Sequence, residues 1–298
     1  MKRLVPSLLI LVSLVLPAHA ASETLTGTLA KIDKSGVVVL GYREGEPPFS
    51  FKNTDGSVIG FSIDLCLKIV DGIKQELGRD DITVEYAVAT PATRFILVKT
   101  GAIDLECAAT TNNAERRELV DYSYPHFMTA TQFVSRRSDG IDGVSDLAGR
   151  SVASASGTVN IDQLNALNRA EGLNIAVMPT RSNEDAFALV TTGRASAFVM
   201  DGILLAAMVA ETPDPSIYAL SSDTLSPPEP YGLLLRHGDL AFKTLVNATL
   251  AGIYTSGEID TIYAKWFTSP IPPRGTNLNL PMSADLAAAF RTPVEYLQ

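Results

Sequence analysis

The sequence predicts an α/β fold whose chain forms two lobes. Short β-branched runs alternate with amphipathic helical segments, a pattern typical of a mostly parallel sheet with covering helices. The alternation occurs in two stretches of similar size, and an extended Pro-rich segment, residues 226–230, follows the second stretch. We therefore expect two α/β units and a segment that crosses between them.

Composition excludes several classes of protein. The 298 residues are 46% hydrophobic and 19% charged, which is too apolar for a disordered chain. The formal net charge of −9 argues against nucleic acid as a partner, because binding to phosphates requires a basic surface. The length suffices for one large domain or two ordinary ones.

Residues 1–20 have the three-part pattern of a secretory signal peptide. Lys2 and Arg3 form the positive end, an apolar run follows at 4–16, and Ala18-His19-Ala20 is a cleavage site. The apolar run is too short to span about 30 Å of hydrocarbon, so a membrane anchor is the weaker interpretation. We expect export of a soluble mature protein.

The first stretch is expected to hold three strands and two helices. Runs rich in β-branched residues predict the strands, and apolar residues at a spacing of four predict the face of the first helix. The strands are placed at residues 37–41, 83–88 and 103–107, and the helices at 59–77 and 94–99.

The second stretch repeats this order, and further elements follow it. Strands are expected at residues 151–155, 175–178 and 195–200, with one helix after residue 158 and another at 183–191. Beyond the Pro-rich segment we expect a strand at 231–235, helices at 242–254 and 259–267, and an irregular tail from residue 271.

Little in the sequence points to catalysis or to a metal. The two histidines beyond the signal peptide, His126 and His237, are far apart, and neither has a second ligand at helical spacing. We find no nucleophile elbow and no phosphate-binding loop. We therefore expect no catalytic centre, no metal and no cofactor. Cys66 and Cys107 predict a disulfide in an oxidising compartment, with two buried thiols as the alternative.

Polar residues follow several predicted strands, at the edge of the sheet where open α/β proteins bind ligands. Arg116 and the backbone N–H groups of Thr111 and Thr158 can hold an α-carboxylate, and Asp201 can accept from an α-ammonium. Arg43 and Arg94 would remain as two positive charges that require a second carboxylate. Taken singly, each residue has a simpler explanation as a surface ion pair or a helix cap.

Several longer stretches resemble the periplasmic glutamate/aspartate-binding proteins of bacterial ABC importers, within the type II periplasmic amino-acid-binding proteins. The resemblance covers the mature chain, and the ECAATTNNAERRE and KWFTSPIPP stretches are the most specific to this subfamily. The matching stretches are residues 41–51, 106–118, 155–158, 197–201, 231–239, 255–258 and 265–273.

The resemblance implies two lobes that close on an amino acid like a hinge. The first lobe would be discontinuous, with residues 21–127 plus 229–298, and the second would hold residues 128–228. The chain would cross between the lobes at 124–131 and again at 226–230. It also implies a monomer in the periplasm that delivers an acidic amino acid to a membrane permease.

The resemblance assigns roles to the polar residues. Arg43 and Arg94 would bind the side-chain carboxylate of the ligand, while Thr111, Arg116 and Thr158 bind its α-carboxylate and Asp201 its ammonium. The chain departs from the family pattern at three positions expected in the site, Pro91, Ala109 and Asn183.

These departures leave alternatives open. The same module could bind glutamine, asparagine or a dicarboxylate. A dehydratase-like enzyme on the same fold is the third alternative, with Glu44, Glu46 or Glu106 as its general acid.

Overall fold

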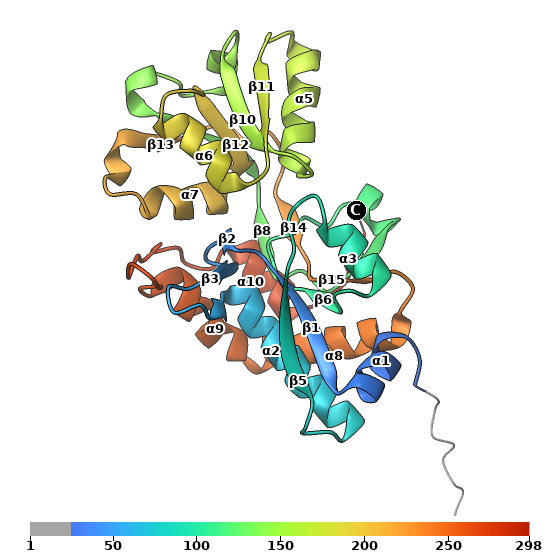
Figure 1. Cartoon of the computed structure of the whole chain (residues 1–298). Helices are drawn as coiled ribbons and strands as arrows, with labels where there is room; N and C mark the ends of the chain where they lie inside the picture. Colours follow the sequence, from blue (N-terminus) through green and yellow to red (C-terminus); the bar gives the residue numbers. More distant parts are fainter. Residues whose placement is uncertain (1–24, 298) are drawn as a thin grey trace, which may run out of the picture.

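A computed structural model describes residues 25–297, so the signal peptide expected at residues 1–20 lies outside the described residues. The chain folds into two α/β lobes with a narrow connection between them (Figure 1). Each lobe is built on one five-stranded sheet, as the repeated alternation of strands and helices predicts.

The sheet of the first lobe has the strand order β5-β1-β6-β15-β7. β1 is parallel to both β5 and β6, whereas β15 is antiparallel to β6 and β7 because the chain returns to this lobe from the second one. Its strands are β1 (Val37–Tyr42), β5 (Thr83–Val88), β6 (Leu105–Glu106), β7 (Val120–Tyr122) and β15 (Leu234–Arg236). A small antiparallel sheet adds β2 (Gly45–Glu46), β3 (Ser50–Lys52) and β4 (Val58–Ile59).

The sheet of the second lobe has the order β11-β10-β12-β9-β13. β10 is parallel to β11 and β12, and β9 is antiparallel to β12 and β13. Its strands are β9 (Thr131–Arg136), β10 (Ser151–Ala155), β11 (Ala176–Thr180), β12 (Ala197–Asp201) and β13 (Tyr218–Leu220).

Helices cover both sheets. The first lobe carries α1 (Gly27–Ser35), α2 (Phe61–Leu77), α3 (Arg94–Thr100), α4 (Ala114–Arg117), α8 (Leu240–Ser256), α9 (Glu258–Tyr263) and α10 (Ala284–Arg291), and a π-type turn (Ala264–Thr268) follows α9. The second carries α5 (Val159–Glu171), α6 (Asn183–Thr191) and α7 (Gly202–Ala210), with short 3₁₀ turns at Arg137–Asp139, Val144–Leu147 and Pro215–Ile217. None of the helices within residues 25–297 combines the length and apolar character that crossing a membrane requires.

Two antiparallel strands connect the lobes. β8 (Phe127–Thr129) leads out of the first lobe, and β14 (Glu229–Tyr231) leads back from the second (Figure 1). The Phe49 ring packs edge-on against Phe127 and Tyr231 of this pair, with ring centroids 4.9 and 5.3 Å apart. The base of the connection is therefore anchored in the aromatic core of the first lobe.

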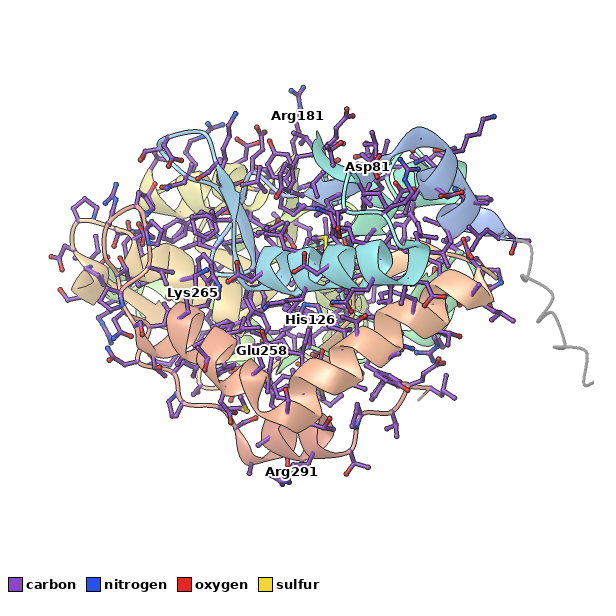
Figure 2. All side chains as sticks on the ribbon, turned by 90° about the horizontal axis from the view of Figure 1, so that it is seen from below. Asp81, His126, Arg181, Glu258, Lys265 and Arg291 are labelled. Atoms are coloured by element: carbon purple, nitrogen blue, oxygen red, sulfur yellow. A yellow bond between two sulfur atoms is a disulfide. The ribbon has the colours of Figure 1, made fainter. Side chains whose placement is uncertain are left out.

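The helices α2, α8 and α9 cover the lower face of the first lobe, and His126 is buried inside this lobe (Figure 2). The His126 Nε2 lies 3.0 Å from the Ser62 hydroxyl, and burial lowers the histidine pKa to about 3. His126 is therefore a neutral core residue. A disulfide joins Cys66 of α2 to Cys107, which directly follows β6, and this confirms the predicted bridge.

Two predictions for the C-terminal region are wrong. The single strand expected at 231–235 is two strands, interrupted at Gly232, where a Cβ would lie 2.9 Å from the Tyr122 ring. The tail expected to be irregular contains α10. Ser283 accepts a hydrogen bond from the Leu286 N–H at its start, and Phe290 packs on Tyr254 with ring centroids 4.4 Å apart.

Candidate functional site

A polar cavity of about 230 Å³ lies between the two lobes. Both lobes supply charged groups to it, and the strands β6, β10 and β12 end at its edge. Its lining residues are Glu46, Arg94, Ala109, Thr111 and Arg116 from the first lobe, and Thr158, Val159, Asn160, Met200 and Asp201 from the second.

Two buried arginines form the positive side of the cavity. Arg94 stands at the start of α3 and Arg116 in α4, and both donate to the Gly157 carbonyl of the other lobe, at 3.1 and 3.3 Å. Both guanidinium groups also lie against the Phe95 ring. Burial and, next in size, the nearby positive charge of Arg116 lower the Arg94 pKa to about 10. Two like charges held this close favour an anion between them.

Asp201 forms the negative side. It occupies the N-cap position of α7, yet its side chain makes no capping hydrogen bond. It instead accepts from Asn160 Nδ2 at 2.9 Å and from the Tyr231 hydroxyl at 2.5 Å. Burial raises its pKa to about 6, against the effect of these two donors. The carboxylate is therefore fixed in orientation and is poorly compensated in charge.

Thr158 and Thr111 complete the cavity with backbone groups. Thr158 caps α5 by accepting from the Ile161 N–H, and its hydroxyl donates to the Ala155 carbonyl at 2.7 Å. Gly157 before it has a φ of +79°, a left-handed conformation that turns the chain from β10 into α5. The Thr111 carbonyl accepts from Arg116 at 3.1 Å, which holds that guanidinium in place.

Arg43 is not the uncompensated charge that the sequence predicts. Its Nη2 lies 2.7 Å from Oε1 of Glu46, and both side chains are buried, at 7% and 5% exposed. Burial raises the Glu46 pKa, while Arg43 opposes this shift. The sequence predicts Glu46 only as a possible enzymatic acid, whereas the structure places it in the lining of the cavity. A carboxylate three residues from Arg43 was the available signal.

The predicted site residues divide between two adjoining pockets. Arg94, Ala109, Thr111, Arg116, Thr158 and Asp201 surround the polar cavity. Arg43, Pro91 and Asn183 instead line a neighbouring pocket of about 860 Å³ between the lobes. Glu46 lines both pockets and so forms the boundary between them.

The other acidic candidates lie outside the polar cavity. Glu44 is exposed and lines only the neighbouring pocket. Glu106 is fully buried, accepts from the Thr110 hydroxyl at 3.0 Å, and has a pKa that burial raises to about 7. Within the described residues, no group of three or more His, Cys, Asp or Glu side chains is arranged to hold a metal ion.

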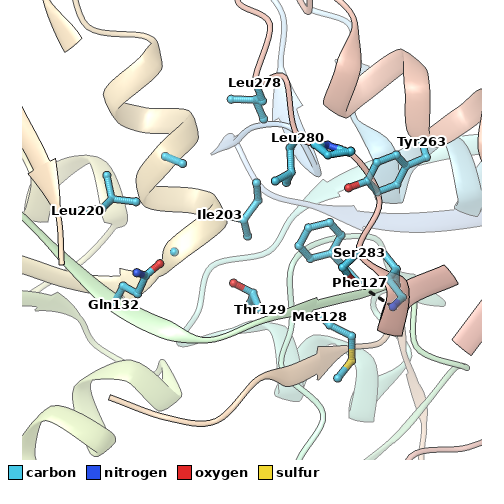
Figure 3. Close-up of a pocket in the computed structure, with 14 residues that line it drawn as sticks. Phe127, Met128, Thr129, Gln132, Ile203, Leu220, Tyr263, Leu278, Leu280 and Ser283 are labelled. Atoms are coloured by element: carbon cyan, nitrogen blue, oxygen red, sulfur yellow. Dashed lines mark hydrogen bonds between the residues drawn. The ribbon is translucent and has the colours of Figure 1, made fainter. Parts of the chain in front are cut away.

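An apolar groove of about 830 Å³ lies beside the connecting strands (Figure 3). It runs between β8 and α7 on one side and the C-terminal segment on the other, with Phe127, Ile203 and Leu280 in its wall. It has no charged lining residue, so it does not complement a zwitterion.

Comparison with known proteins decides the family. The family of bacterial extracellular solute-binding proteins, family 3, matches residues 38–269, which include every lining residue of the polar cavity. The chain belongs to this family.

Two relatives match nearly the whole chain of this family 3 protein. The L-glutamate/L-aspartate-binding protein of Pseudomonas aeruginosa is 38% identical, and the match covers 98% of each chain. The glutamate/aspartate import solute-binding protein of Escherichia coli is 35% identical over 93% of this chain and 91% of its own.

Solved structures of amino-acid-binding proteins share the fold of this family 3 protein. An ancestral amino-acid-binding protein, described as a precursor of cyclohexadienyl dehydratase, superimposes with a TM-score of 0.69. It is 27% identical, and the match covers 82% of this chain and all of that one.

Proposed function

We propose that the protein captures an acidic amino acid, glutamate or aspartate, between its lobes and delivers it to the permease of an ABC importer. It acts as a monomer in the periplasm. The lobes comprise residues 21–127 plus 229–298 and residues 128–228. The names of the relatives from Pseudomonas aeruginosa and Escherichia coli support this ligand class and this transport role.

The match between the charges of the cavity and those of the ligand carries the proposal. Arg43 and Glu46 neutralise each other as an ion pair. Arg94, Arg116 and Asp201 are left, and these complement two carboxylates and one ammonium. Glutamate and aspartate carry that set of charges, whereas glutamine lacks the second carboxylate and succinate lacks the ammonium.

Ligand binding stabilises contact between the lobes. Arg94 and Arg116 of the first lobe already share the Gly157 carbonyl of the second, and Asp201 of the second accepts from Tyr231 on the returning strand. A zwitterion bound by both lobes interacts better with the closed arrangement than with the open one, so it shifts the population toward closure. The permease then recognises the closed form.

Calorimetric titration of the mature protein, unfolded and refolded to remove any bound ligand, tests the proposal. The panel is glutamate, aspartate, glutamine, asparagine and succinate. We expect one of the two acids to bind at least about tenfold more tightly than any of the others, since a charged hydrogen bond contributes roughly 1.5–3 kcal/mol. No detectable binding of either acid, or tighter binding of an amide, would contradict the proposed ligand class.

The variant Arg94→Gln tests which residue binds the second carboxylate of the ligand. It removes the charge assigned to the second carboxylate, so glutamate affinity should fall by about 100-fold while glutamine affinity changes little. Arg169→Gln on the exposed face of α5 is the control, and it should leave both affinities unchanged. An equal loss for both ligands would place Arg94 on the α-carboxylate instead.

A further inference from the structure

Glu46 is a buried carboxyl group in the binding cavity that the proposed function does not use. Its Oε1 pairs with Arg43 at 2.7 Å, while its Oε2 is buried and has no side-chain partner; the backbone N–H of Ala109 also faces this carboxyl group. Glu46 lines the polar cavity together with Arg94, the residue assigned to the second carboxylate, and the charge of Arg94 acts on the Glu46 carboxyl group. This carboxyl group therefore borders the region assigned to the second carboxylate.

When Glu106, which lies outside the lining of the cavity, is counted as well, the buried charges around the cavity balance before a ligand enters. Arg43, Arg94 and Arg116 are each at most 9% exposed, and so are the three carboxyl groups of Glu46, Glu106 and Asp201. An amide zwitterion leaves this balance unchanged. A dicarboxylic amino acid adds one negative charge to a site shielded from water, where uncompensated charge is costly.

On the basis of the proposed function, we propose that Glu46 takes up one proton from solvent when an acidic amino acid binds, and that its protonated Oε2 donates to the ligand's side-chain carboxylate. Proton uptake restores the charge balance and converts a repulsion between two carboxylates into a short charge-assisted hydrogen bond. Glu46 thereby becomes a specificity-determining residue whose preference between acid and amide depends on pH.

The surroundings of Glu46 favour this role over a fixed charge. Burial raises its pKa, and the largest opposing effect comes from Arg43. The Arg94 charge opposes the shift as well, so a ligand carboxylate bound on Arg94 weakens this opposition and raises the Glu46 pKa further. Charged and titratable groups face Glu46 from several elements: Arg43, Arg94, Glu106, Glu184, Asp201 and Tyr231.

Titration of glutamate at pH 8 in phosphate and in Tris, two buffers with different ionisation enthalpies, counts the protons taken up. We expect about one proton per glutamate and close to none for glutamine, and a Kd for glutamate that rises about tenfold per pH unit above neutrality. Glutamate binding without proton uptake would overturn this inference and leave the proposed function intact. Failure of both acids to bind would overturn the proposed function, and this inference with it.

The variant Glu46→Gln mimics the protonated form permanently. Its affinity for glutamate at pH 8 should be at least about tenfold higher than that of the wild type, and its proton uptake should be lost. Glu44→Gln is the control, since Glu44 is exposed and lines only the neighbouring pocket, and it should keep the uptake. Uptake that persists in Glu46→Gln would overturn the assignment. If Glu46→Gln does not fold, the wild-type titration decides alone.

Discussion

Asp201 shows how a single residue can satisfy a local sequence pattern and still serve another purpose. An aspartate directly before a helix ordinarily caps it, and Asp201 precedes α7. Its oxygens are taken instead by Asn160 and Tyr231, which hold the carboxylate toward the cavity. The helix therefore gives up a cap, and the cavity gains an oriented negative charge.

Replacing Asp201 with Asn should abolish amino-acid binding. It removes the only acidic side chain that the second lobe supplies to the cavity, so affinity for glutamate should fall by at least about 100-fold. Asp162→Asn, on the exposed face of α5, is the control. Calorimetry measures both variants, and an Asp201→Asn protein that keeps its affinity would show that the ammonium lies elsewhere.

Most residues of the cavity could be predicted from the sequence, because they follow predicted strands. Arg94, Arg116, Thr158 and Asp201 all follow predicted strands, and the carboxyl ends of parallel strands meet at one edge. The pairing of Arg43 with Glu46 could not be predicted in this way. It depends on the path of the chain from β1 into β2, where a spacing of three residues does not by itself imply contact.

At the scale of elements, the turn between β10 and α5 brings the lobes together. The Gly157 carbonyl accepts from both cavity arginines, and a Cβ on Gly157 would lie 3.0 Å from the Pro91 carbonyl oxygen of the other lobe. The residue therefore needs glycine for two reasons, its positive φ and its close approach across the cleft.

The variant Gly157→Ala separates these two reasons when it is compared with Gly172→Ala. Gly172 ends α5 with a φ of +63° and open space around it, so alanine there meets only the backbone cost of about 1 kcal/mol. Both variants should lose similar stability, but only Gly157→Ala should weaken glutamate binding, by at least about tenfold, because its methyl group opposes closure. Equal affinities in the two variants would show that this contact does not matter for closure.

The elements with the clearest patterns were predicted residue by residue. β5, β10 and α6 have the predicted bounds, because each combines a strong local preference with a turn or cap at its end. α10 was missed since its neighbours in sequence contain Pro272, Pro273 and Pro281, which favour irregular structure. Its stability comes from Leu286 and Phe290 packing on the first lobe, which no local pattern reveals.

At the scale of the whole molecule, the buried carboxyl groups make stability depend on pH. Folding raises the pKa of Glu106 to about 7 and that of Asp201 to about 6, so the folded state binds more protons than the unfolded state near neutrality. Stability must then fall as pH rises through these values. Below about pH 7.5 the buried neutral His126 acts in the opposite direction, because only the unfolded chain protonates it.

The ligand-free protein should gain about 0.5 kcal/mol of unfolding free energy when the pH falls from 8 to 6.5, because the loss from His126 offsets part of the gain from the two carboxyl groups. Glu106→Gln should lose most of this gain, since Glu106 has the higher pKa of the two carboxyl groups. Urea denaturation at the two pH values measures both proteins. A wild type whose stability falls or stays constant on acidification would contradict the raised pKa of Glu106.

The disulfide stabilises the lobe that carries both arginines of the cavity. Cys66 and Cys107 are 41 residues apart, and closing a loop of that length contributes roughly 4 kcal/mol. The double variant Cys66→Ala with Cys107→Ala should lose about that much unfolding free energy, measured by denaturation under non-reducing conditions. Unchanged stability would mean that the packing of α2 against β1 already restrains the same region.

The two-lobed architecture was predictable because its signals are repeated along the chain. Two runs of strand–helix alternation and the Pro-rich crossing segment indicate two units, and the structure builds one sheet from each. The small sheet of β2, β3 and β4 was not predicted, since strands of two or three residues have no period to detect. How closely the lobes approach each other also depends on contacts between distant residues, such as Arg94 with Gly157.

A crystal structure of the mature protein grown with L-glutamate would show whether the ligand occupies the polar cavity. We expect one glutamate there, with its α-carboxylate on Arg116 and Thr158, its ammonium on Asp201 and its second carboxylate on Arg94. Glutamate in the apolar groove beside the connecting strands, or a cavity occupied with the two carboxylates away from both arginines, would contradict it.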